Sequence, residues 1–173
     1  PGSDKPGLDN NAYTNVMAAW VRCRALEVLG ILPEEGCSAI RDKLKLDDAE
    51  IEEWAEISRK LRVIIDEDGI ISQFEGYRDL KEFDWKGYRK RYGNIQRLDR
   101  ILEAEGDSPN AYKVSKQADV LMLFYLFSAE ELEEMFERLN LPWEPEMIPR
   151  NVHYYLKRTP HGSTLSHVVH AWV

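Results

Sequence analysis

The chain has 173 residues, a formal net charge of −8 and a hydrophobic content of 43%. This composition suits a protein with a core, and the longest apolar run, Val120 to Phe127, is far shorter than the roughly 18 residues that a membrane span needs. A pI near 5.1 argues against a nucleic-acid partner, because such binding rests on a basic surface. Two cysteines, Cys23 and Cys37, and no signal-like start predict free thiols and a cytoplasmic protein.

Both ends of the sequence predict that this chain is a piece of a longer protein. Residues 1–7 are rich in Pro and Gly, lack an initiator Met and are typical of a loop. At the other end an apolar helical stripe, spaced i, i+3, i+4 and i+7, reaches the last residues without a stop signal. The stripe consists of Leu165, Val168, Val169 and Trp172. We therefore expect some functional groups to lie outside the chain.

The N-terminal half predicts two helices and a hairpin. The first helix begins after Asp9 or Asn10 as its cap and runs to about Leu29, where Gly30 supplies a stop. The second begins after Asp47 or Asp48 and ends near Arg62. β-Branched residues on both sides of an Asp-Gly turn at 66–69 then predict two short strands, and the aromatic-rich stretch 74–92 predicts irregular structure.

The C-terminal half is predicted to be helical almost throughout. One helix covers about residues 95–106, and a second, nearly all apolar, begins at Ser115 and ends at Phe127. Ser128 and Glu131 form a capping-box pattern ahead of the most clearly amphipathic helix, which ends near Asn140. Successive helices with short loops predict an all-α fold of antiparallel helical hairpins.

A possible anion site precedes the last helical stripe. An imidazole, two hydroxyls and a Gly meet there at the expected start of a helix, where free backbone N–H groups and the helix dipole favour a phosphate. The residues are His161, Gly162, Ser163 and Thr164. The alternative is that Ser163 or Thr164 merely caps the helix.

Two further groups of residues could bind a sugar. Lys116 and Gln117 offer several donors to sugar hydroxyls, although Lys116 could instead form an internal pair with Asp119. Glu75 lies among aromatic residues, as carboxylates in carbohydrate clefts often do, and the alternative is that these aromatics only pack. The aromatic residues are Phe74, Tyr77, Trp85 and Tyr88.

Four segments, in this order along nearly the whole chain, resemble the catalytic domain of glycoside hydrolase family 65, the maltose, kojibiose and trehalose phosphorylases. They are Asp9-Asn-Asn-Ala-Tyr-Thr-Asn15, Ile71-Ser-Gln-Phe-Glu-Gly-Tyr77, Lys116-Gln-Ala-Asp-Val120 and His161-Gly-Ser-Thr-Leu-Ser166. The resemblance implies an α/α six-barrel, of which residues 1–173 would form about the C-terminal half, with a short β-hairpin insertion.

The resemblance also implies roles for residues. A Glu acts as general acid in this family while phosphate attacks the anomeric carbon from the other face, with inversion. That Glu is expected upstream of Pro1, so no catalytic residue is expected in this chain. Lys116 and Gln117 would hold the glucosyl unit, residues 161–164 would hold phosphate, and Glu75 would contact sugar hydroxyls or act as a base in a hydrolase. No metal or organic cofactor is expected.

The expected parent is a cytoplasmic phosphorylase, homo-oligomeric, that cleaves a trehalose-, maltose- or kojibiose-type disaccharide with inorganic phosphate. An inverting α-glucosidase of the same family, with water as the nucleophile, is the first alternative. A helical fragment or interaction module without activity of its own is the second, because the isolated chain lacks the acid and half of the cleft wall.

Overall fold

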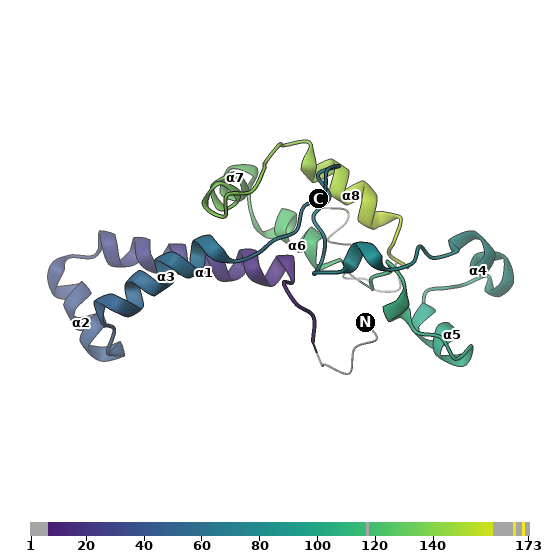
Figure 1. Ribbon diagram of the computed structural model, residues 1–173, viewed down its shortest axis with the longest axis horizontal. Helices are drawn as coiled ribbons and strands as arrows, with labels where there is room; N and C mark the ends of the chain where they lie inside the picture. The colour runs from purple at the N-terminus through teal and green to yellow at the C-terminus, as the bar shows by residue number, and fades with distance from the viewer. Residues whose placement is uncertain (1–6, 117, 161–167, 169–170, 172–173) are drawn as a thin grey trace.

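The computed structural model describes residues 7–116, 118–160, 168 and 171. Over these residues the chain forms eight α-helices and two short 3-10 helices, and it contains no strand longer than an isolated bridge. The helices are arranged along an elongated body, with α1 to α3 at one end, α4 and α5 at the other and α6 to α8 between them (Figure 1). The predicted all-α fold is therefore confirmed for the described residues.

Helix α1 (Ala12–Ile31) is about 30 Å long at the usual rise per residue. Its cap is Asn11, whose side-chain oxygen accepts from the N–H of Thr14 at 2.8 Å, so the prediction of Asp9 or Asn10 was wrong. Asn10 instead has a left-handed backbone with φ 52°. The helix also continues past Gly30, because one Gly inside a helix weakens it without ending it.

Helix α3 (Asp48–Lys60) runs back along α1 and begins at the predicted cap, where the Asp47 carboxylate accepts from the N–H of Glu50. Helix α2 (Glu34–Leu44), which connects α1 to α3, was not predicted from the sequence. It has no buried residue, so its sequence lacks the wide apolar stripe that identifies a core helix. It begins after Pro33 and ends at Lys45, which has a left-handed backbone.

The predicted hairpin is reduced to a tight turn. A single antiparallel bridge joins Ile65 and Ile71, and the N–H of Gly69 donates to the carbonyl of Asp66 at 2.9 Å. Buried Asn151 holds this turn against α8 (Met147–Leu156), since its side chain accepts from the N–H of Ile71 and donates to the carbonyl of Gly69. Two backbone bonds flank the bridge, from the N–H of Asp66 to the carbonyl of Ile70 at 3.1 Å and from the N–H of Ser72 to the carbonyl of Ile64 at 2.8 Å.

Residues 81–113 form a lobe with a small core of its own. It contains α4 (Trp85–Tyr92), α5 (Leu98–Ala104) and the 3-10 helix η2 (Pro109–Ala111), and η1 (Tyr77–Asp79) precedes it. Phe83 is at its centre, with ring centroids 4.5 to 5.4 Å from those of Trp85, Tyr88 and Tyr112. The prediction of irregular structure was wrong for α4, which Asp84 caps. Helix α5 lies within the predicted span 95–106.

The main core lies where α6 (Asp119–Leu126), α7 (Ala129–Arg138) and α8 meet α1 and the turn. The capping box of α7 is confirmed, since Ser128 and Glu131 exchange bonds of 3.0 and 3.2 Å. Fully buried members include Val16, Ile71, Leu121, Phe136 and Tyr155. Among the described residues no helix has the length and apolarity to cross a membrane.

Candidate functional site

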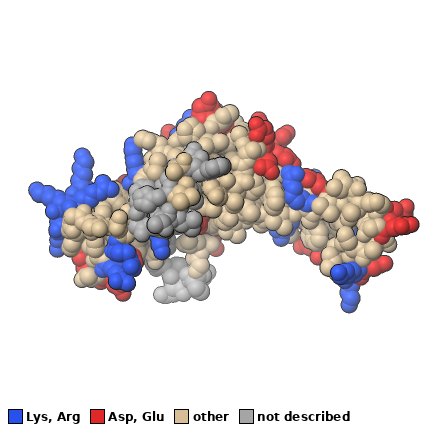
Figure 2. Space-filling view, turned by 180° about the vertical axis from the view of Figure 1, so that it is seen from behind, with Lys and Arg blue, Asp and Glu red and all other residues tan. Residues whose placement is uncertain are grey.

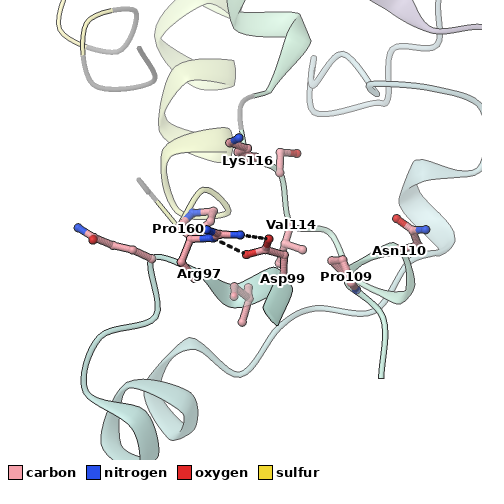
Figure 3. A pocket seen from close by; sticks show the side chains of 10 residues that line it. Arg97, Asp99, Pro109, Asn110, Val114, Lys116 and Pro160 are labelled. Atoms are coloured by element: carbon pink, nitrogen blue, oxygen red, sulfur yellow. Dashed lines mark hydrogen bonds and ion pairs between the residues drawn. The ribbon is translucent and has the colours of Figure 1, made fainter. Parts of the chain in front are cut away.

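Lys116 lies at a bend just before α6 and lines a pocket of about 450 Å³, within the range of small-molecule sites. Because α6 begins at Asp119 and not at Ser115 as predicted, Lys116 is exposed and is not inside a buried helix. It forms no ion pair with Asp119 or with any other described residue. We call this site the Lys116 pocket (Figure 3); its polar lining comprises Gln96, Arg97, Asp99, Asn110, Ser115 and Lys116.

Two tertiary hydrogen bonds hold the segment before α6 in place. The buried amide of Gln73 donates to the hydroxyl of Ser115 at 2.6 Å, and the N–H of Ser115 donates to the carbonyl of Arg158 at 3.1 Å. These bonds explain why Ser115 does not begin the helix. They also bring Lys116 close to Pro160, which lines the same pocket and immediately precedes the predicted anion site.

Glu75 lies at the N-terminal end of α1 and not in the Lys116 pocket. One of its carboxylate oxygens accepts from the side chain of Asn10 at 2.6 Å, and the other accepts from Arg62 at 3.0 Å. Asn15 completes the cluster by donating to the carbonyl of Arg62 at 2.7 Å. The carboxylate is exposed and keeps free acceptor positions, so it can still accept from a sugar hydroxyl.

The first two family motifs meet through their backbones. The N–H of Ala12 donates to the carbonyl of Gln73 at 3.0 Å, and the N–H of Glu75 donates to the carbonyl of Asp9 at 2.9 Å. Gln73 then reaches Ser115, next to Lys116, through its side chain. Segments that are far apart in sequence therefore form one connected region.

The aromatic residues near Glu75 do not form a platform. Tyr77 is 1% exposed in the main core, where Phe74 contacts it edge-on at 5.5 Å. Burial, which is the largest contribution, raises the pKa of Tyr77 well above its ordinary value. Trp85 and Tyr88 belong to the separate core of the lobe. Packing, the alternative left open by the sequence, is the role that the structure shows.

A charged cluster beside the pocket was not predicted. Arg158 donates to Glu82 at 2.9 Å, and Lys113 lies 3.4 Å from the same carboxylate oxygen. Burial raises the pKa of the Glu82 carboxyl, but the hydrogen bond and charge of Arg158 outweigh it and Lys113 adds to them, so the pKa lies below its usual range. The cluster fixes the end of α8 to the lobe. No local spacing in the sequence signals it.

The sequence also did not single out Arg97 and Asp99. The guanidinium donates to both carboxylate oxygens, from Nε at 3.1 Å and from Nη2 at 2.9 Å. In Figure 3 this pair lies below Lys116, with Pro160 beside Arg97. A bidentate contact of this kind fixes the plane of a guanidinium and leaves its third nitrogen available.

Gln117 and the four residues predicted to hold phosphate, His161, Gly162, Ser163 and Thr164, lie outside the described residues. So does most of the predicted last helix. The structure thus places Lys116 in a pocket and Glu75 in a neighbouring polar cluster.

The described helices thus carry a polar pocket just before α6. A family model described as the glycosyl hydrolase family 65 central catalytic domain matches residues 1–173, so the chain belongs to that family. The resemblance stated from the motifs is confirmed.

Two proteins and one solved structure are similar to this chain. An uncharacterized glycosyl hydrolase of Mycobacterium tuberculosis is 57% identical over the whole chain, which covers 13% of that protein. Trehalose 6-phosphate phosphorylase of Lactococcus lactis is 39% identical over the whole chain, which covers 21% of it. A solved structure described as a candidate kojibiose phosphorylase from the human microbiome aligns with a TM-score of 0.70 and 25% identity, over 95% of this chain and 20% of that one. The chain therefore spans about a fifth of these relatives or less.

Proposed function

We propose that the protein containing this chain is an inverting phosphorylase of an α-linked glucose disaccharide of the trehalose, maltose or kojibiose type. The observation that carries the proposal is the Lys116 pocket, which has cations, a hydroxyl and amides beside the start of the third family motif. Membership of family 65 and relatives named as phosphorylases support it. The expected compartment is the cytoplasm, and the expected parent is a homo-oligomer.

In the proposed reaction, Lys116 and Gln117 bind hydroxyls of the glucosyl unit, and His161 to Thr164 bind inorganic phosphate. A phosphate oxygen forms a bond to the anomeric carbon as the glycosidic C–O bond breaks. A Glu upstream of Pro1 gives its proton to the leaving oxygen. The products are β-glucose 1-phosphate and the second sugar. Glu75, held by Asn10 and Arg62, accepts from a sugar hydroxyl.

The alternative is an inverting α-glucosidase in which water takes the place of phosphate. Full-length protein incubated with trehalose, maltose and kojibiose, with and without phosphate, separates the two. Phosphate-dependent release of β-glucose 1-phosphate supports phosphorolysis, whereas equal release of free glucose in both conditions supports the hydrolase.

Lys116→Ala tests the assignment of the pocket. We expect kcat/KM to fall by about 10- to 100-fold, since a charge-assisted hydrogen bond to substrate contributes about 1.5–3 kcal/mol. Lys81→Ala is the matched control, because Lys81 is exposed and does not line the pocket. An unchanged Lys116→Ala enzyme would remove this residue from the substrate site.

A further inference from the structure

The Lys116 pocket lies between two parts of the molecule that have separate cores. One wall comes from the lobe, which supplies residues 96–99, 109 and 110, and the other wall is formed by residues 114–116 and 160. The hydrophobic cluster of the lobe, which contains Phe83, Leu98 and Leu102, is distinct from the main core. The shape of the pocket therefore depends on how the lobe is held against the rest of the chain.

The lobe is joined to the main core through a narrow neck. The chain enters the lobe at Lys81 and leaves it at Lys113, and the two connections are paired. The N–H of Lys81 donates to the carbonyl of Ala111 at 3.0 Å, and the N–H of Lys113 donates to the carbonyl of Lys81 at 2.8 Å. Two adjacent connections of this kind can act as a hinge. A contact beside the neck therefore has a direct effect on the orientation of the lobe.

The side chain of Arg158, just after α8, makes such a contact. It donates to the carboxylate of Glu82 at 2.9 Å, and among the ion pairs of the described residues this one alone joins the lobe to the rest of the chain. The guanidinium also lies over the ring of Tyr154, with Cζ 3.7 Å from the ring centroid, and donates to the Tyr154 carbonyl at 3.0 Å. The end of α8 thus fixes the orientation of the guanidinium that holds the lobe.

The backbone of Arg158 holds the opposite wall of the pocket. Its carbonyl accepts from the N–H of Ser115, which precedes Lys116, at 3.1 Å. Pro160, two residues further along the chain, lines the same wall. One residue therefore contacts the lobe through its side chain and the Lys116 segment through its carbonyl. The Arg158 side chain is only 18% exposed, so salt screens its ion pair less than a fully exposed one.

We propose that Arg158 is a positioning residue whose ion pair with Glu82 sets the relative position of the two walls of the Lys116 pocket, and with it the position of the bound sugar. This inference rests on the proposed function and adds to it a residue that does not itself line the pocket. Loss of the ion pair lets the lobe leave the orientation that binds sugar. The effect on binding is then limited to what the pair contributes to that orientation.

The overall charge of the lobe offers a different explanation, which a control separates from the ion pair. Figure 2 shows Lys and Arg side chains gathered over the α4 end of the molecule, and α4 ends in Arg89, Lys90 and Arg91. None of these three residues lines the Lys116 pocket. Arg91 instead pairs with Glu105 inside the lobe, so its removal changes the charge of the lobe without changing the contact to α8.

The experiment measures sugar binding and turnover by the full-length protein. Calorimetric titration with glucose gives Kd, and steady-state kinetics with inorganic phosphate and trehalose, maltose or kojibiose separate KM from kcat. For Arg158→Gln we expect the Kd for glucose and the KM for the disaccharide to rise by about three- to tenfold. A purely structural role predicts a different result, since loss of folded enzyme lowers kcat and leaves Kd and KM unchanged.

Further variants test the route through Glu82. Glu82→Gln should weaken glucose binding in the same direction, and adding Arg158→Gln to it should have little further effect. Arg158→Lys keeps the charge without the planar fork and should recover part of the lost affinity. Arg91→Gln is the matched control and should leave Kd and KM unchanged.

Unchanged Kd and KM in Arg158→Gln would overturn the inference, as would an equal change in Arg91→Gln or a fall in kcat alone. Absence of glucose binding by the unaltered protein would also overturn it, because the pocket would then hold no sugar. Failure of the proposed function is recognised separately. It shows as the absence of phosphate-dependent turnover with all three disaccharides, while Arg158→Gln still weakens glucose binding.

Discussion

Gln73 and Ser115 are 42 residues apart in sequence, yet their side chains form a 2.6 Å hydrogen bond inside the protein. Gln73 belongs to the motif that contains Glu75, and Ser115 precedes Lys116. The bond therefore joins the two sugar-binding segments predicted from the sequence. Gln73 is 7% exposed, so water does not readily replace a lost partner.

Gln73→Ala should lower the free energy of unfolding by about 1–3 kcal/mol, because it leaves the segment before α6 without its buried anchor. As a positioning residue, Gln73 should affect kcat/KM of the full-length enzyme by about tenfold. A double-mutant cycle with Ser115→Ala checks the contact, since the double variant should be no less stable than Gln73→Ala. Additive losses would show that the two residues act independently.

Asn151→Ala should also destabilise the chain by about 1–3 kcal/mol. The buried amide donates to the carbonyls of Met147 and Gly69 and accepts from the N–H of Ile71, and all three partners lose a bond. Denaturant unfolding measures the change. His153→Ala, exposed on the same helix, is the control and should change stability by less than about 0.5 kcal/mol. Similar values for both variants would contradict this role of Asn151.

The Arg97–Asp99 pair should persist across the whole functional pH range. Arg97 lowers the pKa of Asp99 from 3.8 to about 2, so the carboxylate stays ionised until strongly acid pH. For a depressed carboxyl pKa, the stabilisation is complete above the unfolded value and disappears as pH falls through the folded one, between about pH 4 and 2. Carboxyl NMR titration should give this midpoint, and Arg97→Gln should return it toward 3.8. An unchanged midpoint in that variant would disprove the pairing.

Glu105 should hold α4 and α5 together. It accepts from the hydroxyls of Tyr88 and Tyr92 and from Arg91. The hydrogen bond to Glu105, with burial adding to it, raises the pKa of Tyr88 to about 12. Stabilisation from a raised pKa is complete below the unfolded value of about 10 and is lost as pH rises through about 12. Glu105→Gln should shift the ultraviolet tyrosinate titration downward, and Glu103→Gln, exposed on α5, should not.

The isolated chain should self-associate. Val21, Val28 and Ile31 follow one stripe of α1 and are 54%, 46% and 80% exposed. Apolar patches of this kind tend to find partners in water. Sedimentation velocity at increasing concentration measures the effect, and Val28→Lys with Ile31→Lys should reduce it. A monomer at all concentrations would contradict the expectation.

The sequence by itself determined the features whose causes lie within a few residues. The capping box at Ser128 and Glu131 and the cap at Asp47 depend on bonds three residues apart, and both were predicted correctly. Family membership could also be predicted from the sequence, because each family motif is a short contiguous segment. Periodicity likewise identified α1 and α3, since burial of one helical face imposes a regular spacing.

Only the tertiary structure decided where those elements stop and what they form together. Ser115 does not begin α6, since its polar groups bond to Gln73 and Arg158, and the turn between Ile65 and Ile71 is fixed to α8 by Asn151. The Lys116 pocket likewise forms where the start of α5 and Pro160 line the same space. Each of these features depends on contacts between residues dozens of positions apart, which packing selects and which no local pattern encodes.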